Sequence, residues 1–259
     1  MNNLHKITLE AINHLIQNDE VIAKSNQELA FSQVGIKSSD IGMLIKTYDK
    51  LFNKSKSQFR QDIFALMELN FKNNGYFIEF GASHGGEGSN TWLLEKEFGW
   101  QGILAEPSKC FHQELKANRS VHIEEKCVWS SSNEVLLFNE VTLPGLSGLS
   151  TIDSFSNSDG HAHLRNDGNR YSVTTISLID LLEKYNAPKI IDYLSIDTEG
   201  TEFEILSHHD FDKYKFKVIT CEHNYTQSRE NVFNLLSSKG YVRKFEDVSL
   251  VDDWYVLMD

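Results

Sequence analysis

A glycine-rich turn flanked by acidic residues is the first part of the sequence whose residue types could do chemistry. The apolar run that contains Glu79 leads into Gly81, and more glycines follow before an amphipathic stretch begins near Ser89. Glycine permits a sharp turn and a close approach of a ligand to the backbone, and the start of a helix offers free N–H groups to a carboxylate or phosphate. From Gly81 the spacing is Gly-x-x-x-Gly, which differs from the Gly-x-Gly-x-x-Gly of a dinucleotide site.

A second acidic residue, Glu106, follows the next apolar run in the segment ILAEPS. In an open α/β sheet, ligands bind at the carboxyl ends of the strands, where an acid after the second strand can accept both hydroxyls of an adenosine ribose. The alternative is a tight turn with two surface acids. The order of strand, glycines, helix and acid favours a ligand site.

The elements expected to position these residues alternate between buried strands and amphipathic helices from Gly75 onward. Such alternation implies a mostly parallel sheet covered on both faces, with an antiparallel pair at the C-terminal end. The polar segment from Asn139 to Arg170 is predicted to be a loop that shapes the ligand pocket or closes over it. We expect strands at 76–80, 102–105, 121–128, 190–196, 217–221, 241–245 and 254–258, and helices at 90–98, 108–117, 176–185, 202–208 and 229–239.

Composition and charge exclude several classes of function. The chain has 259 residues, of which 40% are hydrophobic and 24% charged, and its formal net charge is −12; it is therefore globular and has no overall electrostatic attraction to nucleic acid. Cys110, Cys127 and Cys221 are too widely spaced for a zinc or redox motif, and no apolar run is long enough to span a membrane. We therefore expect a cytoplasmic protein that binds neither nucleic acid nor membranes. Helical periodicity predicts an N-terminal helical cap at 1–55 and a main domain at 56–259.

Several motifs in order resemble a known family. The acid-x-Gly-x-x-x-Gly motif and the antiparallel final strand pair are similar to those of class I S-adenosylmethionine-dependent methyltransferases, which have a Rossmann-like, seven-stranded sheet. The segment IIDYLSIDTEGTEFEIL more specifically resembles the signature of the FkbM family of methyltransferases, as do SQFRQD, SNTWLLEKEFGWQGILAEPS and TTISLIDLL. The resemblance covers roughly Lys56 to Met258, and it implies S-adenosylmethionine as the cofactor.

The resemblance also implies which residues bind that cofactor. Glu106 would hold the ribose hydroxyls, with Pro107 beside the adenine and with Cys127 and Val128 near the adenine edge. Cys127 has the alternative of a plain core residue, because free cysteine behaves as a small buried hydrophobe. Contacts to the methionine and ribose part are implied for Glu79, Gly81, Ala82 and Ser83, and contacts to the amino-acid end for Ser57, Gln58 and Asn90; for Gln58 a helix-cap contact is an equal alternative.

Transfer of a methyl group to a hydroxyl requires alignment with the sulfonium and removal of the hydroxyl proton. By the resemblance, Asp197 faces the methyl group from the end of the fourth strand, with Glu199 on the same turn, and both are candidate catalytic residues. Glu222 and His223 end the adjacent fifth strand. Two alternatives stay open: His223 is a catalytic general base oriented by a carboxylate, or Asp197, Glu222 and His223 hold a divalent cation, Mg or Mn, that binds the acceptor oxygen. Glu202, which opens the next helix, is interpreted as dipole compensation.

The sequence therefore predicts a methyltransferase that acts on a hydroxyl of a sugar, glycan or secondary metabolite. One rival is a nicotinamide-dependent oxidoreductase, which the glycine spacing disfavours. Another is a module that binds an adenosine cofactor without catalysis.

Overall fold

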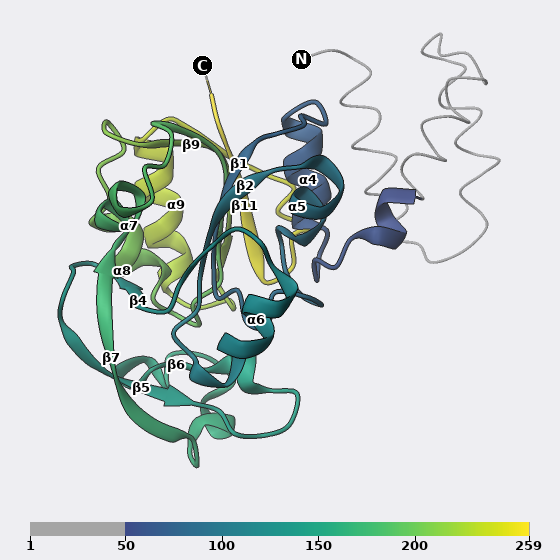
Figure 1. Cartoon of the computed structure of the whole chain (residues 1–259). Helices are drawn as coiled ribbons and strands as arrows, with labels where there is room; N and C mark the ends of the chain where they lie inside the picture. Colours follow the sequence, from purple (N-terminus) through teal and green to yellow (C-terminus); the bar gives the residue numbers. More distant parts are fainter. Residues whose placement is uncertain (1–49, 259) are drawn as a thin grey trace, which may run out of the picture. The chain divides into compact units, whose positions relative to one another are not determined.

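A seven-stranded sheet forms the centre of the compact unit that begins at Lys56. The structure is a computed structural model that describes residues 50–258, so the predicted helical cap at 1–55 lies outside the described residues except for its last six positions. The strand order is β10-β11-β9-β8-β1-β2-β3 (Figure 1). The strands are β1 (Tyr76–Phe80), β2 (Gln101–Ala105), β3 (His122–Glu124), β8 (Ile190–Ile196), β9 (Lys215–Glu222), β10 (Tyr241–Lys244) and β11 (Asp252–Leu257).

The direction of the strands confirms the predicted fold class. Neighbouring strands from β9 to β3 are parallel, whereas β11 is antiparallel to both β9 and β10. Ile78 of β1 lies opposite Ile103 of β2 and Leu194 of β8, so one buried row of apolar side chains crosses the middle of the sheet. Strands buried on both faces read as continuous apolar runs, which is why these strands could be predicted.

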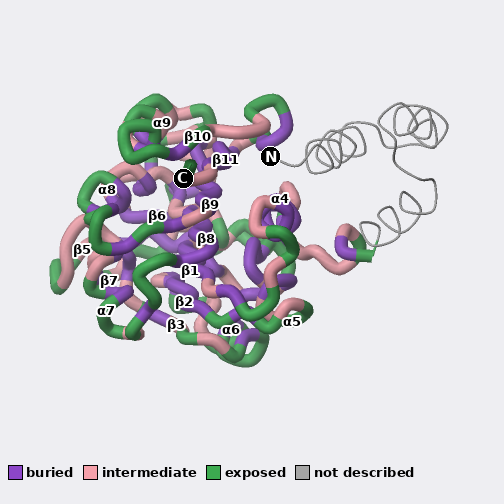
Figure 2. The backbone as a smooth tube through the Cα atoms, turned by 90° about the horizontal axis from the view of Figure 1, so that it is seen from above, coloured by how far each residue is buried: buried purple, intermediate pink, exposed green. Residues whose placement is uncertain are grey.

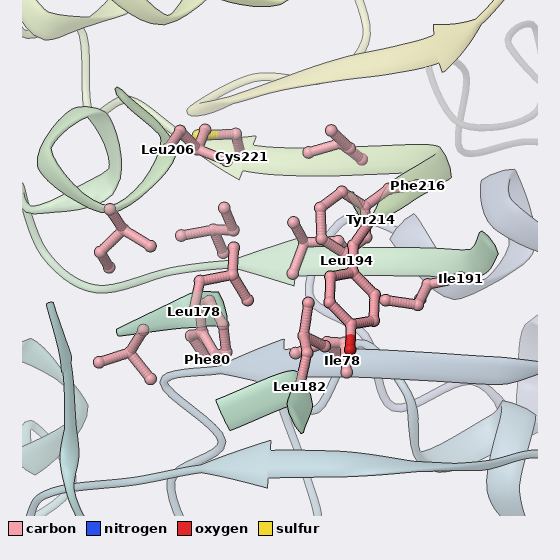
Figure 3. Packing of buried hydrophobic residues seen from close by; sticks show 14 of the residues in the cluster. Ile78, Phe80, Leu178, Leu182, Ile191, Leu194, Leu206, Tyr214, Phe216 and Cys221 are labelled. Carbon is pink, nitrogen blue, oxygen red and sulfur yellow. The ribbon is translucent and has the colours of Figure 1, made fainter. Parts of the chain in front are cut away.

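Helices cover both faces of this sheet. Figure 1 shows α7, α8 and α9 on one face and α4 and α5 on the other. Leu178 and Leu182 of α7 pack near Ile78 and Phe80 of β1 (Figure 3), because their spacing places both on one side of the helix. Viewed from above, the strands are buried while the outward sides of the helices are exposed (Figure 2). The helices are α4 (Gln61–Glu68), α5 (Trp92–Phe98), α6 (His112–Asn118), α7 (Leu178–Lys184), α8 (Glu202–Ser207) and α9 (Ser228–Ser238), with 3-10 turns η1 (Lys109–Phe111), η2 (Ser147–Leu149), η3 (Asp153–Phe155) and η4 (Ala162–Arg165).

A second, smaller sheet corrects two predictions. It has the order β4-β7-β5-β6, so the segment 139–170 is not a loop without secondary structure. The predicted strand 121–128 is in fact two strands that lie in different sheets. The hydrogen-bond ladder of the main sheet ends at Glu124, because the backbone N–H of Lys126 donates to the Glu124 side chain instead of to a neighbouring strand. The strands of this sheet are β4 (Cys127–Trp129), β5 (Val135–Glu140), β6 (Thr151–Ile152) and β7 (Asn169–Ser177).

The boundary between β7 and α7 also differs from the prediction. The helix was expected from Ile176, but the strand continues to Ser177 and the helix begins at Leu178. The Ser177 side chain accepts the N–H of Asp180 and so caps the helix. Along residues 50–258, no helix is both long and apolar enough to cross a lipid bilayer.

Candidate active site

A cavity, partly open to solvent, lies where the carboxyl ends of the central strands meet the second sheet. The main sheet contributes the ends of β1, β2 and β8, and the second sheet contributes Phe138 of β5 and Ile152 of β6. Six residues predicted to bind the cofactor or to catalyse transfer line it: Gly81, Glu106, Pro107, Cys127, Val128 and Asp197. The carboxyl edge of the sheet is the expected ligand position in an α/β fold.

The glycine turn is set by the backbone around it. Gly81 has φ +73°, and a Cβ atom there would lie 1.8 Å from the carbonyl oxygen of Asp197. The glycine is therefore required for the ends of β1 and β8 to approach each other, a reason that differs from the ligand approach expected from the sequence. Ala82 is buried, and Ser83 takes φ +46°. This conformation aims the Ser83 N–H at Glu106, with a distance of 2.8 Å to Oε2.

Glu106 presents a buried carboxyl group to the cavity. Its Oε2 accepts the N–H of Ser83, and its Oε1 accepts the N–H of Ser108 at 2.7 Å. Burial raises its pKa to about 7, while the two backbone donors act in the opposite direction. Each carboxylate oxygen keeps a further acceptor position, so the pair suits the two neighbouring hydroxyls of a ribose.

The side chains of Glu79 and Asn90 make hydrogen bonds to other residues of the protein and do not line the cavity. Glu79 accepts the N–H of Asn90 at 2.7 Å and lies 3.6 Å from the buried Arg119 guanidinium. The Asn90 side chain accepts from Ser57 at 2.7 Å. Gln58 is exposed, whereas its neighbour Ser57 is buried. The predicted cofactor contacts of Gln58, Glu79, Ala82, Ser83 and Asn90 stay predictions.

Three carboxyl groups gather beside the cavity: those of Asp197, Glu199 and Glu222 each offer an oxygen within 4.8 Å of the others. Burial raises the pKa of Asp197 to about 7. Burial first, and then the nearby Asp197 carboxylate, also raises the pKa of Glu199 and of Glu222. Glu222 is only 9% exposed, and its Oε2 has no hydrogen-bond partner among the described residues. An unpartnered buried carboxyl oxygen is costly. Either a proton shared with the neighbouring Asp197 carboxyl group or a divalent cation between these oxygens would satisfy it.

His223 is not part of this group. Its Nδ1 accepts the N–H of Tyr225 at 3.0 Å, its Nε2 lies 3.8 Å from Asp253, and it does not line the cavity. Burial lowers its pKa. The structure thus brings together Asp197 and Glu222 of the predicted ligand set, but the third group is Glu199 instead of the histidine. Three carboxylates without an imidazole are hard oxygen ligands of the kind that Mg and Mn prefer.

Glu202 serves the turn before its helix. Its Oε1 accepts the N–H groups of Thr198 and Gly200, both at 3.0 Å. These contacts fit the interpretation that Glu202 stabilises the start of α8. They also hold the loop that carries Asp197 and Glu199 in a fixed shape.

The segment 139–170 does help to form the pocket, as predicted, because Ser147, Gly148 and Ser150 line the cavity. Sequence reasoning missed Arg165, which bonds to Glu199 with its guanidinium fully buried. A polar stretch without periodicity gives no sign that one arginine in it will be buried. A second cluster of possible metal ligands includes Asp159 and His161. The positive charge in that cluster is already supplied by the guanidinium of Arg165, which makes two hydrogen bonds to Asp159.

The sequence profile of the methyltransferase FkbM domain family matches residues 79–254. No curated protein matches the chain. Among solved structures, a precorrin-6y C5,15-methyltransferase from Geobacter metallireducens GS-15 is similar at 11% identity and a TM-score of 0.39, over 75% of this chain and 85% of that one. A point mutant of MtNAS in complex with S-adenosylmethionine is similar at 11% identity and a TM-score of 0.34, over 98% and 73%. The CurJ carbon methyltransferase shares 10% identity at a TM-score of 0.36, over 76% and 53%.

Proposed function

Because the chain belongs to the FkbM methyltransferase family, we propose that it transfers a methyl group from S-adenosylmethionine to a hydroxyl group of a sugar, glycan or secondary metabolite. The observation that carries the proposal is the position of Glu106. Its carboxyl group ends β2, lines the cavity and keeps an acceptor position on each oxygen. That is the arrangement that two ribose hydroxyls require.

The charge of the cavity supports a cationic donor. Among the described residues that line it, Glu106 and Asp197 are the acidic ones, and Lys, Arg and His are absent. S-adenosylmethionine, when bound, supplies a methyl group on a positively charged sulfur. Acidic side chains in a partly buried cavity attract such a cation and disfavour an acceptor that carries a phosphate or carboxylate at the reacting end. We infer that the acceptor is neutral or cationic at that end.

The chemistry required of the chain is alignment and removal of one proton. The walls of the cavity include Phe80, Phe111 and Phe138. Such apolar walls restrict the acceptor, and alignment in such a site supplies much of the acceleration. Asp197 is the candidate base, because it lines the cavity and burial brings its pKa to about 7, near the operating pH at which a general base works best.

A divalent cation is the alternative way to activate the hydroxyl. Asp197, Glu199 and Glu222 would hold it, and its chemistry would be to lower the pKa of the acceptor hydroxyl. The unpartnered Oε2 of Glu222 is the observation that supports this alternative.

The proposed function is tested by offering the protein S-adenosylmethionine with a labelled methyl group together with a pooled glycan and metabolite extract. We expect intact-mass detection of a product heavier by one methyl group, and calorimetric binding of S-adenosylhomocysteine. Binding of NAD in place of S-adenosylhomocysteine would support an oxidoreductase. Binding of S-adenosylhomocysteine without transfer to any acceptor in a broad screen would support a module without catalysis.

A further inference from the structure

Arg165 is an unusual side chain for the segment in which it lies. It is part of the 3-10 turn η4, in a polar stretch between β6 and β7, yet its relative exposure is 0%. A guanidinium is removed from water at a large cost unless carboxylates and carbonyls satisfy it. Its partners therefore indicate what its burial achieves.

The guanidinium contacts three separate parts of the chain. Nε donates to the carbonyl oxygen of Leu149 at 2.7 Å. The two terminal nitrogens form a fork on Asp159, at 2.8 and 2.9 Å. One of them also donates to Oε2 of Glu199 at 2.8 Å. The fork fixes the plane of the guanidinium, so the other two contacts have defined directions.

Two of these partners belong to the candidate active site. Leu149 lies between Gly148 and Ser150, which line the cavity, and Glu199 is one of the three clustered carboxylates. The same side chain thus holds the cavity wall on the second sheet and the acidic turn on the main sheet.

Other contacts join the same two regions. The Thr151 hydroxyl donates to the backbone carbonyl of Glu199 at 3.0 Å. Gly200 packs so closely on Ser158 that a Cβ atom at the glycine would lie 2.7 Å from the serine hydroxyl. The Asn139 amide donates to the backbone carbonyl of Arg165 at 3.0 Å and ties η4 to β5. The second sheet is therefore docked on the turn that carries Asp197 and Glu199, with Arg165 at the centre of the contact.

We propose that Arg165 is a positioning residue of the active site, which places the cavity wall at Leu149 and the Glu199 carboxylate in one fixed geometry. The catalytic consequence rests on the proposed function, whereas the structural coupling does not. Lysine cannot replace it, because a single ammonium lacks the planar fork that serves three partners in defined directions.

The experiment compares Arg165→Lys with a matched control, Arg170→Lys. Arg170 also pairs with an aspartate, Asp153 of η3 at 2.7 Å, but among the described residues it makes no hydrogen bond to Leu149 or Glu199. Hydrogen exchange is followed at two protected amides, that of Leu149, bonded to Leu146, and that of Gly200, bonded to Glu202. In Arg165→Lys both amides are expected to exchange at least about tenfold faster, whereas the control is expected to keep the wild-type rates.

A functional readout separates positioning from general stability. We expect methyl transfer by Arg165→Lys to fall more than about tenfold at saturating donor, while the Kd for S-adenosylhomocysteine changes less than about threefold, because Glu106 and the glycine turn lie on other elements. Since part of the effect is expected to run through Glu199, the loss of transfer in the double variant Arg165→Lys/Glu199→Gln should be smaller than the product of the two single losses.

Several results would overturn the proposal: unchanged exchange at either amide, equal loss of cofactor affinity and turnover, or additive effects in the double variant. If Arg165→Lys does not fold, Asp159→Asn is used instead. This variant disturbs the fork without removing either contact to the site, and a smaller acceleration at both amides is expected. If the wild-type protein transfers no methyl group, the proposed function fails, and hydrogen exchange still decides whether Arg165 couples the two regions.

Discussion

Replacement of Glu106 is the most direct test of the cofactor site. In Glu106→Gln the amide keeps one acceptor oxygen, so one ribose hydroxyl loses its acceptor and meets an NH2 group. A hydrogen bond to a charged group contributes about 2 kcal/mol, which corresponds to a Kd for S-adenosylhomocysteine that is about 30-fold higher. In Glu106→Ala both hydroxyls lose their acceptor, and about 4 kcal/mol corresponds to a Kd roughly a thousandfold higher.

The assay is isothermal titration calorimetry of S-adenosylhomocysteine against each variant, with Glu124→Gln as the matched control. Glu124 is also a buried glutamate at the carboxyl end of a strand, but it pairs with Lys184 and does not line the cavity. The control should bind as the wild type does. Equal affinities of Glu106→Ala and the wild type would refute the assignment of the ribose site.

The pH dependence of binding gives an independent check on the same residue. Because the pKa of Glu106 is raised to about 7 in the free protein, part of the population must lose a proton before the carboxylate can accept both hydroxyls. Affinity should therefore fall as the pH is lowered from 8 to 6, approaching a tenfold loss per pH unit below the pKa. The slope should vanish in Glu106→Gln, and a slope that survives there would assign the proton to another group.

Three further predictions concern packing, the cation and stability. Gly81→Ala should lower the free energy of unfolding, measured in urea, by more than about 3 kcal/mol, because the Asp197 carbonyl must move. The control is Gly88→Ala: Gly88 also has a positive φ but has open space around it, so this change should cost only about 1 kcal/mol. Equal losses would contradict the close approach of the two strands. Electron paramagnetic resonance should show that Mn²⁺ binds to the wild type and to His223→Gln but not to Glu222→Gln. Loss of binding in His223→Gln instead would support the ligand set expected from the sequence. Folding raises the pKa of Glu106 from 4.5 to about 7. The stability that this shift contributes is complete below pH 4.5 and is lost as the pH rises through about 7. The melting temperature of the free protein should therefore fall between pH 5 and pH 8, and it should fall less in Glu106→Gln.

The sequence alone predicted the main sheet and the position of Glu106, which lines the cavity. Apolar runs such as Ile190–Ile196 are buried on both faces, so they are recognisable without knowledge of their neighbours. Glu106 could be placed because the carboxyl ends of parallel strands lie along one edge of the sheet. These features depend on local sequence and on a topology that the order of strands and helices already implies.

Tertiary structure alone decided which side chains meet at the acidic cluster. Glu222 and His223 are consecutive at the end of an extended strand, so their side chains leave the backbone in opposite directions and only one can face Asp197. The sequence does not say which. Likewise, no local pattern marks Arg165 for burial. Two of its three partners, Leu149 and Glu199, lie 16 and 34 residues away in the chain, and these contacts exist only once the second sheet docks on the turn after β8.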